Sequence, residues 1–494
     1  MKNQVVNPYL PQWEYVPDGE PHVFGDRVYV YGSHDRFGAK MFCVENYTCW
    51  SAPVDDLSDW RCEGTIFRKT QDPSNRMGLR LLFAPDCVQG ADGRFYLYYA
   101  FDFLGQIGVA VADTPAGPFE HLGHVSWPDG TPYGRRTGDG FPFDPGVLIE
   151  DDGTAWLYTG FYTPVPSIAS GFHKCAFDGG YVLHLQSDML TITGDQKLLF
   201  PKEGPGSFEG HEFFEASSIR KYGDTYLFVY SSRLNHELCY ATSTRPDGDF
   251  VYGGTLVSIG DVGLPGHTDE KSASNYTGNT HGGVLRIPPA DDDGSDPFAG
   301  TWYVFYHRQT NRSSYARQAC AERLVRDTSR EGLNFLQSEV TSCGLNDGPL
   351  AGIGAYEARI ACNLWSDEGA GRVDGSSPKR RLAKHPYFTQ EGPVGKEGAR
   401  QYIANMRHGA TAGFKYFDLG GTHHISVTVR AKGQGGFAIT ADPDLREILG
   451  TVSFGPCKDW TTFEDEIVPA GTSSALYFRY MGEGCVDFLG FTLS

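Results

Sequence analysis

The chain contains 494 residues, 40% of them hydrophobic, which suits two to four domains or one large repeat fold with an appended domain. This hydrophobic content also excludes a mainly disordered chain. The 42 Lys and Arg residues are outnumbered by 61 Asp and Glu residues, which gives a net charge of −19. An acidic surface of this kind repels phosphate backbones, so we expect no nucleic-acid partner.

The chain shows no membrane or secretion signal in its residue pattern. No apolar run is long enough to span a bilayer, and the first residues, Met1 to Gln4, lack the apolar core of a secretory signal. The eleven cysteines are an odd number, spread from Cys43 to Cys485 without a C-x-x-C pair. Because disulfide frameworks favour even, clustered sets in shorter chains, we predict reduced, mostly buried thiols. We therefore expect a cytoplasmic location and no membrane partner.

A repeated pattern is the main indication of the fold. A turn containing Gly or Asp is followed by alternating aromatic and aliphatic residues, which is a hairpin signal. The matching aromatic residues of successive copies are 60 to 77 residues apart: Tyr29, Tyr96, Trp156, Tyr226 and Tyr303. Five units of this length, each a small antiparallel sheet, predict an all-β fold with a five-bladed β-propeller over residues 1–325. The alternative is a generic sandwich in which the turns coincide by chance.

The repeats fade after about residue 325. Residues 326–355 are turn-rich and are predicted to connect two domains. From Tyr356 to Ser494 the chain is again strand-rich but aperiodic, with good alternation in residues 425–430 and 475–480. This length and strand spacing predict a β-sandwich over residues 356–494.

Three acids occupy equivalent places, each shortly before one of the repeated strand patterns. They are Asp18, Asp144 and Glu215, and all have apolar, aromatic or small neighbours. An acid in such surroundings must be paired, protonated or functional. For one acid alone, a turn cap or a buried ion pair is the simpler explanation. Three acids at the same place in three predicted blades favour a site, although Asp86 shares the position and spacing cannot exclude it.

The ordered set of blade motifs resembles glycoside hydrolase family 43 over roughly residues 5–325. The segments that carry the resemblance are Asn7-Pro8, Pro17-Asp18-Gly19-Glu20-Pro21, Phe83-Ala84-Pro85-Asp86, Phe143-Asp144-Pro145-Gly146 and Glu215-Ala216-Ser217-Ser218. The departures are Gly19 and Ala216-Ser217, at positions where the family commonly has Pro and Gly-Pro; neither replaces an acid. From Tyr356 onward the chain resembles a family 6 carbohydrate-binding module, less specifically.

The resemblance implies an inverting five-bladed propeller enzyme that acts on xylan and arabinan side chains and oligosaccharides. It implies that Asp18 is the general base that activates water and that Glu215 is the general acid. Asp144 would orient Glu215 and tune its pKa. The residue types agree with inversion, which needs two carboxyls about 6.5–9.5 Å apart, one ionised and one protonated. A third acid raises the pKa of the proton donor by like-charge repulsion.

Four further residues are candidates for the site. The resemblance places His281 near the propeller axis beside a water-coordinated metal ion, often calcium; the alternative is a histidine satisfied within a turn. Phe83 is predicted to form a wall for the sugar ring, or else to be a core aromatic. Arg308 is predicted to bind sugar hydroxyls, with a surface ion pair as the alternative. Asp35 is predicted either to bind sugar or to cap a loop.

The sequence therefore predicts an exo-acting glycosidase that releases terminal pentoses from xylo- or arabino-oligosaccharides. The motif set is most similar to enzymes active on both β-D-xylosides and α-L-arabinofuranosides. Two alternatives remain open. The first is a non-catalytic carbohydrate-binding propeller, and the second is another five-bladed enzyme of the invertase or phosphorylase kind.

Overall fold

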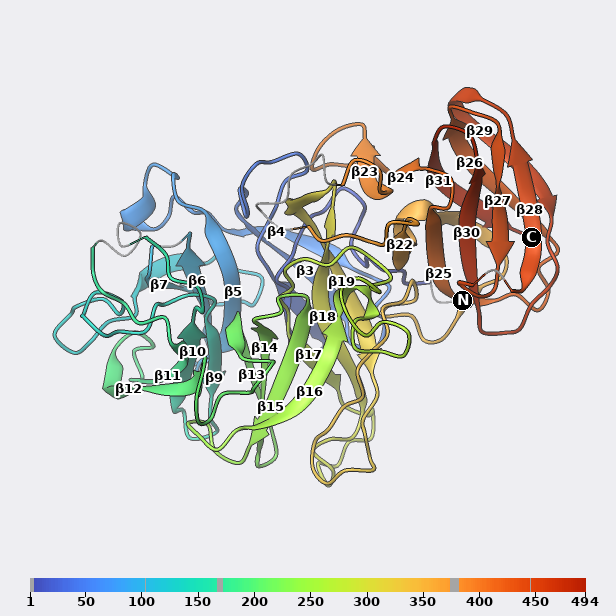
Figure 1. Ribbon diagram of the computed structural model, residues 1–494. Coiled ribbons are helices and arrows are strands. Elements are labelled where there is room, and N and C mark those ends of the chain that lie inside the picture. The colour runs from blue at the N-terminus through green and yellow to red at the C-terminus, as the bar shows by residue number, and fades with distance from the viewer. Residues whose placement is uncertain (1–3, 103, 167–171, 374–381, 445) are drawn as a thin grey trace.

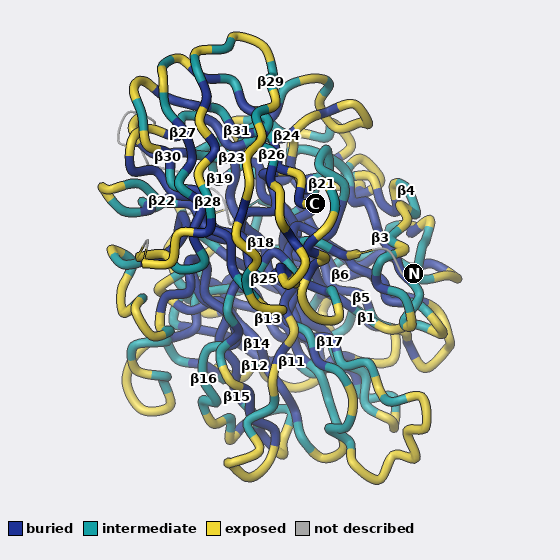
Figure 2. The backbone as a smooth tube through the Cα atoms, turned by 90° about the vertical axis from the view of Figure 1, so that its right-hand side faces the viewer, coloured by how far each residue is buried: buried dark blue, intermediate teal, exposed yellow. Residues whose placement is uncertain are grey.

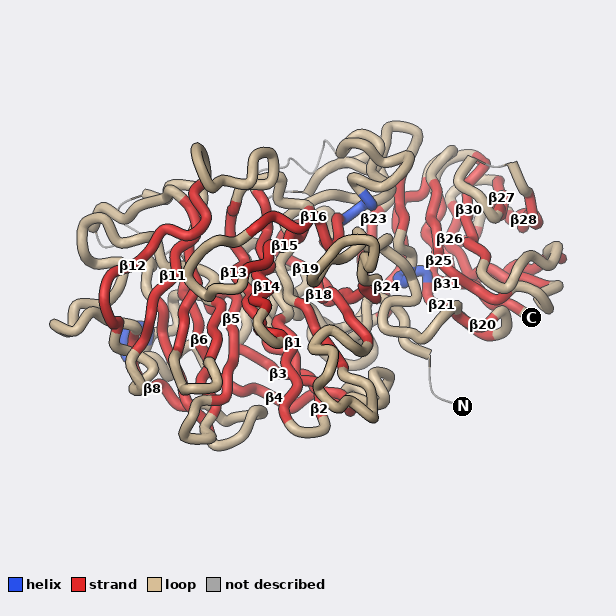
Figure 3. The backbone as a smooth tube through the Cα atoms, turned by 90° about the horizontal axis from the view of Figure 1, so that it is seen from below, coloured by secondary structure: helices blue, strands red, loops and turns tan. Residues whose placement is uncertain are grey.

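The computed structural model describes residues 4–494 except 103, 167–171, 374–381 and 445. Strands form nearly all of the regular structure in these residues, in two parts that lie side by side (Figure 1, Figure 3). Within the described residues, the helical segments are three short 3₁₀ turns: η1 (Pro73–Asn75), η3 (Ile259–Asp261) and η4 (Ala358–Ile360). Within the described ranges, no helix has the length and apolar character needed to cross a membrane.

The first part consists of five antiparallel sheets in chain order, which we call blades 1 to 5. Blade 1 contains β1 (Glu20–Phe24), β2 (Arg27–Tyr31), β3 (Tyr47–Pro53) and β4 (Arg61–Phe67). Blade 2 contains β5 (Leu82–Gln89), β6 (Phe95–Phe101), β7 (Ile107–Ala112) and β8 (Glu120–His124). Blade 3 contains β9 (Gly146–Ile149), β10 (Ala155–Gly160), β11 (Gly179–Leu185) and β12 (Ile192–Pro201). Blade 4 contains β13 (Phe213–Tyr222), β14 (Thr225–Ser232), β15 (Glu237–Ser243) and β16 (Val251–Ser258). Blade 5 contains β17 (Val284–Ile287), β18 (Thr301–Thr310) and β19 (Ser313–Leu324).

The five repeated patterns form the second strand of each blade, namely β2, β6, β10, β14 and β18. Each follows a turn that reverses the chain after the first strand. Gly93 and Gly153, in two of these turns, have φ angles of 82° and 85°, which glycine adopts without the steric cost of a side chain. The sequence repeat therefore marks the hairpin that starts each blade.

Buried side chains close the blades into a ring. Five apolar clusters each lie between two consecutive blades, and the fifth joins blade 5 back to blade 1 through residues such as Val30 and Phe305. The first strand of blade 1, β1, also contacts both β5 and β17. Figure 2 shows the interior strands as buried and the connecting turns as exposed. The predicted all-β propeller is confirmed.

The N-terminal segment lies along the outer strand of blade 5. The Asn7 side chain donates to the carbonyl of Ala321 at 2.9 Å and accepts a hydrogen bond from the N–H of Ala321 at 3.1 Å. The Tyr9 N–H donates to the Ala319 carbonyl at 3.3 Å. Blade 5 has only three strands of its own, so this segment occupies the place of a fourth strand. The start and the end of the propeller chain are thereby tied to the same blade.

The second part is a sandwich of two six-stranded sheets around one apolar core. One sheet contains β20 (Leu350–Ala351), β22 (Asn363–Trp365), β25 (Thr411–Asp418), β27 (Gly435–Thr440), β28 (Ile448–Phe454) and β30 (Ser474–Gly482). The other contains β21 (Gly354–Glu357), β23 (Tyr387–Glu391), β24 (Arg400–Met406), β26 (His424–Ala431), β29 (Cys457–Glu466) and β31 (Val486–Leu493). The predicted sandwich after the propeller is confirmed.

The sandwich is packed against the propeller through buried polar contacts. The Tyr15 hydroxyl donates to Gln390 at 2.5 Å, and the Asn311 N–H donates to the Phe388 carbonyl at 2.7 Å. The buried ammonium group of Lys415 lies 3.2 Å from the Asp261 carboxylate. The connecting residues also contribute Leu333, Phe335 and Val340 to the core between blades 4 and 5. The predicted domain limits themselves stay a prediction.

Candidate active site

Three carboxyl groups from three blades line one small cavity of about 180 Å³. Asp18 lies two residues before β1, Asp144 lies two residues before β9, and Glu215 is the third residue of β13. His281 and Arg317 line the same cavity. The structure therefore brings together the three acids and the histidine that were predicted from sequence.

The backbone at the three acids is unusual in the same way. Asp18 and Asp144 have positive φ angles of 58° and 45°, and Ala216, directly after Glu215, has a φ of 68°. Residues with side chains rarely adopt this left-handed region, and it clusters at functional sites. The pairing of β13 with β14 is also irregular on both sides of Glu215. A bulge of this kind re-aims a side chain, and here it directs Glu215 into the cavity.

Two glycines allow close backbone approach beside the acids: Gly146 lies against blade 4, and Gly282, just before β17, lies against β18 of its own blade. A Cβ on Gly146 would lie 2.6 Å from the Ser217 carbonyl oxygen, and one on Gly282 would lie 1.9 Å from the Phe305 carbonyl oxygen. Gly282 also forms a bridge with Gly19. Because Gly19 follows Asp18 and Gly282 follows His281, this bridge places Asp18 beside His281. Close backbone approach is the physical need for glycine at these positions.

Asp18 is held in its ionised form. Burial alone would raise its pKa, but the Arg317 guanidinium, 2.9 Å from the carboxylate, holds the pKa well below its usual range. His307 assists as a hydrogen-bonding neighbour: its Nε2 donates to the Asn279 carbonyl at 2.9 Å, and its Nδ1 accepts from the Asp18 N–H at 3.3 Å. This network assigns the neutral tautomer to His307, and burial lowers its pKa in agreement.

Glu215 is held in its protonated form. Loss of bulk water raises the pKa of its carboxyl well above the ordinary value, and the neighbouring Asp144 carboxyl raises it further. Burial also raises the pKa of Asp144, although His281, with its Nδ1 3.4 Å away, opposes the shift. Burial alone would lower the pKa of His281, but the Asp144 carboxylate raises it to about 9. At neutral pH the cavity therefore contains an ionised Asp18, an imidazolium at His281 and a neutral Glu215.

Four phenylalanines form the apolar wall of the cavity: Phe42, Phe83, Phe143 and Phe161. Successive rings are in contact, with centroids 6.2, 5.4 and 5.0 Å apart. The Phe42 ring also packs under the Arg317 guanidinium at 4.8 Å. Flat aromatic faces suit the apolar faces of sugar rings. The structure therefore places Phe83 where the sequence prediction put it, at the wall of the cavity.

Asp35 lies behind the cavity and does not line it. Its carboxylate pairs with Arg317, with Nε to Oδ2 at 2.9 Å and Nη2 to Oδ1 at 3.0 Å. It also accepts the N–H of Cys43 at 2.9 Å. A two-point pair of this kind fixes the plane of the guanidinium. Asp35 therefore positions Arg317 against Asp18 and also caps its own loop through Cys43, as one of the two predictions had it. The predicted sugar contact of Asp35 is corrected, because its carboxylate does not line the cavity.

The structure does not bring Arg308 to the cavity. Its guanidinium donates to the carbonyls of Ala361 at 2.8 Å and Arg359 at 2.5 Å, and packs 4.0 Å from the Phe388 ring centroid. All three residues belong to the sandwich side of the interface. The prediction that Arg308 binds sugar hydroxyls is corrected on this geometry: Arg308 joins the two domains.

The structure also separates Asp86 from the other three acids. Asp86 lies within β5, where its carboxylate accepts the Val147 N–H at 2.7 Å and lies 2.6 Å from His22 Nε2. Among the described residues that line the cavity, Asp86 is absent. Its carboxyl connects blade 2 to Val147 of blade 3 and to His22 of blade 1, so Asp86 has a structural role. Sequence spacing alone could not separate it from the other three acids.

Several cavity residues were not predicted from the sequence. They are Phe42, Phe143, Phe161, Asn235, Asn279, Ser314 and Arg317, with His307 behind them. Arg317 carried a usable signal, because it is a charged residue within the strand-like run Ser313–Leu324, where burial would demand a partner. Phe42, Asn235 and Asn279 lie outside regular strands, and the sequence pattern around them gave no signal of a place in the cavity.

Comparison with known proteins identifies the family and the fold to which the chain is similar. The model of the glycosyl hydrolases family 43 matches residues 7–328. A xylosidase/arabinosidase of Thermoclostridium stercorarium is 45% identical over 498 residues, covering 100% of this chain and 99% of its own length. The crystal structure of a family 43 arabinoxylan arabinofuranohydrolase from Bacillus subtilis, in complex with cellotetraose, has a TM-score of 0.50 and 20% identity, and covers 99% of this chain and 97% of its own. A family 43 β-xylosidase/α-arabinofuranosidase from a compost microbial metagenome, in complex with xylotriose and in a calcium-free form, has a TM-score of 0.50 and 22% identity over 68% of this chain and 98% of its own.

The interface role of Arg308 predicts a loss of stability without a substrate effect. Arg308→Ala should lower the free energy of unfolding by about 2–3 kcal/mol, because two buried carbonyls lose a charged donor. The KM should stay within about twofold of the wild-type value, since a change that leaves the site's contacts intact leaves substrate binding intact. Chemical denaturation and steady-state kinetics check both values. A raised KM at unchanged stability would restore the sugar contact predicted from sequence.

Proposed function

Because the chain belongs to the glycosyl hydrolases of family 43, we propose that it is an inverting, exo-acting hydrolase that releases terminal pentoses from xylo- or arabino-oligosaccharides. The observation that carries the proposal is the pair of carboxyls in opposite protonation states within one cavity. The pKa of Asp18 is held low by Arg317, and the pKa of Glu215 is raised by loss of water and by Asp144. Inverting hydrolysis needs such a pair, one as base and one as acid.

Asp18 is the general base of the proposed mechanism. Its carboxylate takes a proton from a water molecule as that water attacks the anomeric carbon. The Arg317 guanidinium keeps Asp18 ionised before the step and fixes its orientation, because Asp35 holds that guanidinium from behind. An ionised base within reach of the water is what general-base catalysis requires.

Glu215 is the general acid. It donates its proton to the glycosidic oxygen as the bond to the anomeric carbon breaks. Asp18 takes the proton lost by the water, so Glu215 loses one proton and Asp18 gains one in each turnover. Asp144 keeps Glu215 protonated until then, because two neighbouring buried carboxyls resist double ionisation. The contact with His281 keeps the charge on Asp144 rather than on Glu215.

The cavity supports a single pentose at the reacting position. Its volume of about 180 Å³ suits one sugar ring better than an internal segment of a polymer, which supports exo action. The cavity is also lined by Asn235, Asn279 and Ser314, whose side chains offer hydrogen bonds to hydroxyls. β-D-Xylosides and α-L-arabinofuranosides present similarly placed hydroxyls, and the relative of 45% identity is named a xylosidase/arabinosidase. The proposal therefore includes both activities.

The two alternative functions are less well supported. A propeller that only binds carbohydrate needs no base and acid in opposite protonation states, and this site has both. An invertase-type enzyme retains configuration and needs its two carboxyls only about 5–5.5 Å apart, with no room for water between them. The configuration of the released sugar distinguishes this class from ours.

We also propose that a calcium ion binds near His281, held largely by water. In the described part of the chain, three groups of His, Cys, Asp or Glu residues have donor atoms within 4.8 Å of one another, and His281 belongs to none of them. Protein side chains alone would therefore not surround an ion at His281, which supports water as the main ligand. Nearby, Glu20 Oε2 is buried without a hydrogen-bond partner and faces Gly283. A carboxylate oxygen with water suits calcium, a hard cation that prefers oxygen ligands. The ion would displace the proton of His281 and supply the positive charge beside the acids in its place.

The proposed activity is tested with nitrophenyl β-D-xyloside and nitrophenyl α-L-arabinofuranoside side by side. We expect hydrolysis of both, with nitrophenyl hexosides as the control that is left intact. Proton NMR during the first minutes should show the inverted anomer of the released pentose, because water attacks once from the face opposite the leaving oxygen. Release of the retained anomer would contradict the mechanism, and no hydrolysis of either substrate would contradict the function.

The role of Glu215 predicts a dependence on the leaving group. Glu215→Ala should lower kcat/KM for xylobiose by about 10²–10⁴-fold, the usual contribution of general-acid catalysis. The loss for an activated nitrophenyl xyloside should be much smaller, because nitrophenolate departs without a proton. Asp18→Ala is the matched control: it should lower activity on both substrates alike, since the water loses its base whatever group leaves. Equal losses for both substrates in Glu215→Ala would exclude this assignment.

The calcium proposal predicts a reversible loss of activity. Dialysis against EGTA, verified by elemental analysis, should lower kcat, and calcium but not zinc should restore it. His281→Ala should lose most of this response to calcium. Full activity in protein verified to be free of calcium would show that the ion has no function here.

A further inference from the structure

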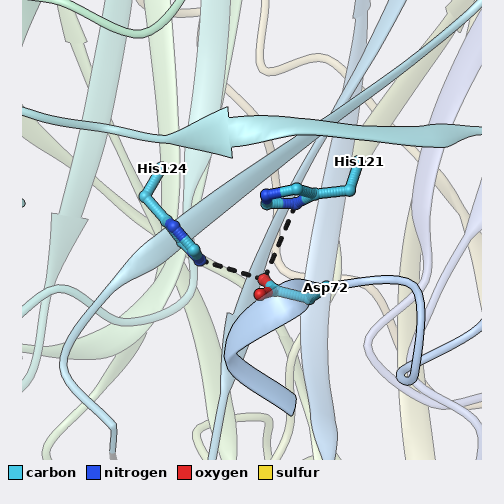
Figure 4. A group of neighbouring side chains, drawn as sticks. All are labelled: Asp72, His121 and His124. Carbon is cyan, nitrogen blue, oxygen red and sulfur yellow. Dashed lines mark hydrogen bonds and ion pairs between the residues drawn. The ribbon is translucent and has the colours of Figure 1, made fainter. Parts of the chain in front are cut away.

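Asp72, His121 and His124 form a second polar group, on the outer edge of blade 2 and away from the cavity. Figure 4 shows both imidazoles pointing at the Asp72 carboxylate. His124 Nε2 lies 2.9 Å and His121 Nδ1 lies 3.7 Å from Asp72 Oδ2, and the three donor atoms all lie within 4.8 Å of one another. None of the three residues lines the catalytic cavity.

The two histidines share one face of β8 because of a bulge. Side chains alternate along a strand, so residues three apart normally point to opposite faces. The pairing of β7 with β8 matches Val109 with Gly123 but Ala110 with His121, so that Leu122 is an extra residue. This bulge reverses the alternation and turns His121 and His124 to the same side.

Asp72 presents one carboxylate oxygen to the histidines. It lies in the connection between β4 and β5, where its Oδ1 caps η1 by accepting the Ser74 N–H at 2.8 Å and the Ser74 hydroxyl at 2.7 Å. The side chain is fully buried, with an exposed fraction of 0%. Its Oδ2 also accepts the hydroxyl of Tyr99 at 2.7 Å, and that hydroxyl lies 2.9 Å from His121 Nδ1. The carboxylate is therefore fixed on both sides before any ligand arrives.

The spacing of the donor atoms suits a tetrahedral metal ion. Bonds of about 2.0–2.1 Å in tetrahedral geometry place two donor atoms roughly 3.3–3.4 Å apart. The observed distances of 2.9 and 3.7 Å from Asp72 Oδ2 lie on either side of this value. Small rotations of the two side chains, which are partly exposed at 14% and 21%, are enough to reach it.

The donor set selects the class of metal. Two imidazole nitrogens and one carboxylate oxygen are typical of zinc and its transition-metal neighbours, whereas calcium and magnesium prefer oxygen alone. Tyr99 would act as the outer partner that orients the carboxylate.

We propose that Asp72, His121 and His124 bind a divalent transition-metal ion, zinc in the first instance, with water completing the tetrahedron. The ion takes the place of the hydrogen between His124 Nε2 and Asp72 Oδ2, and in the neutral ring that hydrogen moves to Nδ1 of His124. It ties the connection between blades 1 and 2 to β8, the outer strand of blade 2, and so stabilises the propeller without taking part in hydrolysis.

The test compares metal-free wild-type protein with His121→Ala/His124→Ala, each titrated with zinc sulfate by calorimetry and by thermal unfolding. Wild type should bind one zinc equivalent more than the double variant, and zinc should raise the melting temperature further in wild type than in the double variant. Zinc held elsewhere, for example by His211, Glu237 and Cys239, binds to both proteins. The difference in bound zinc between wild type and the double variant therefore reports only the ion at Asp72, His121 and His124. His424→Ala, at an exposed position of β26, is the matched control and should behave as wild type.

X-ray absorption of the zinc-loaded wild type checks the ligands without any substitution. We expect two imidazole nitrogens and oxygen donors, with no sulfur in the first coordination sphere. Zinc loading should leave kcat on nitrophenyl xyloside unchanged, which separates this ion from calcium at His281. Equal zinc binding by wild type and the double variant, or sulfur ligation of the single bound ion, would show that the three residues form a hydrogen-bonded cluster only.

Discussion

The charge balance inside the cavity governs the rest of the site. Among the residues that the structure describes, two cations oppose Asp18 and Asp144, namely Arg317 and the imidazolium of His281, and Arg317 is already shared with Asp35. Glu215 forms no ion pair with any of these residues, so ionising it would add an uncompensated negative charge beside Asp144 in a low-dielectric setting. The proton therefore stays on Glu215. The ionised state of Asp18, the proposed base, and the protonated state of Glu215, the proposed acid, both follow from one arrangement of charges.

This arrangement depends on how the ring of blades is closed. The acids come from blades 1, 3 and 4, while the two cations come from the segment before β17 and from β19. The bridge between Gly19 and Gly282 and the N-terminal segment along β19 hold blade 5 against blade 1. Without this closure, Asp18 would be separated from Arg317 and His281, and its burial would no longer be compensated.

The sandwich supports the same part of the propeller. His307 and Arg308 are consecutive on β18, so alternation places their side chains on opposite faces of the strand. His307 contacts Asp18 on the inner face, and Arg308 binds the carbonyls of Ala361 and Arg359 on the outer face. The contact of Asn311 with Phe388 holds the turn that joins β18 to β19, the strand that carries Arg317. The sandwich thus fixes the hairpin that positions the charges around Asp18.

The sequence by itself determined the family, the all-β propeller with a sandwich, the class of reaction and the three acids. These follow from local patterns: a turn before an alternating strand repeats in each blade, and an acid in apolar surroundings stands out in one dimension. The domain limits and the cytoplasmic location stay predictions, and the eleven free cysteines are compatible with the reduced thiols that we expected.

What only the tertiary structure decided concerns partners that are distant in the chain. Arg317 lies 299 residues from Asp18, and nothing near either residue indicates their pairing. Asp86 and Arg308 matched local patterns but belong to contacts between blades and between domains, and the bulge in β8 reverses the alternation that sequence would assign to His121 and His124. The physical reason is the same throughout: local patterns specify strands and turns, whereas protonation and contact depend on which distant groups the closed ring brings together.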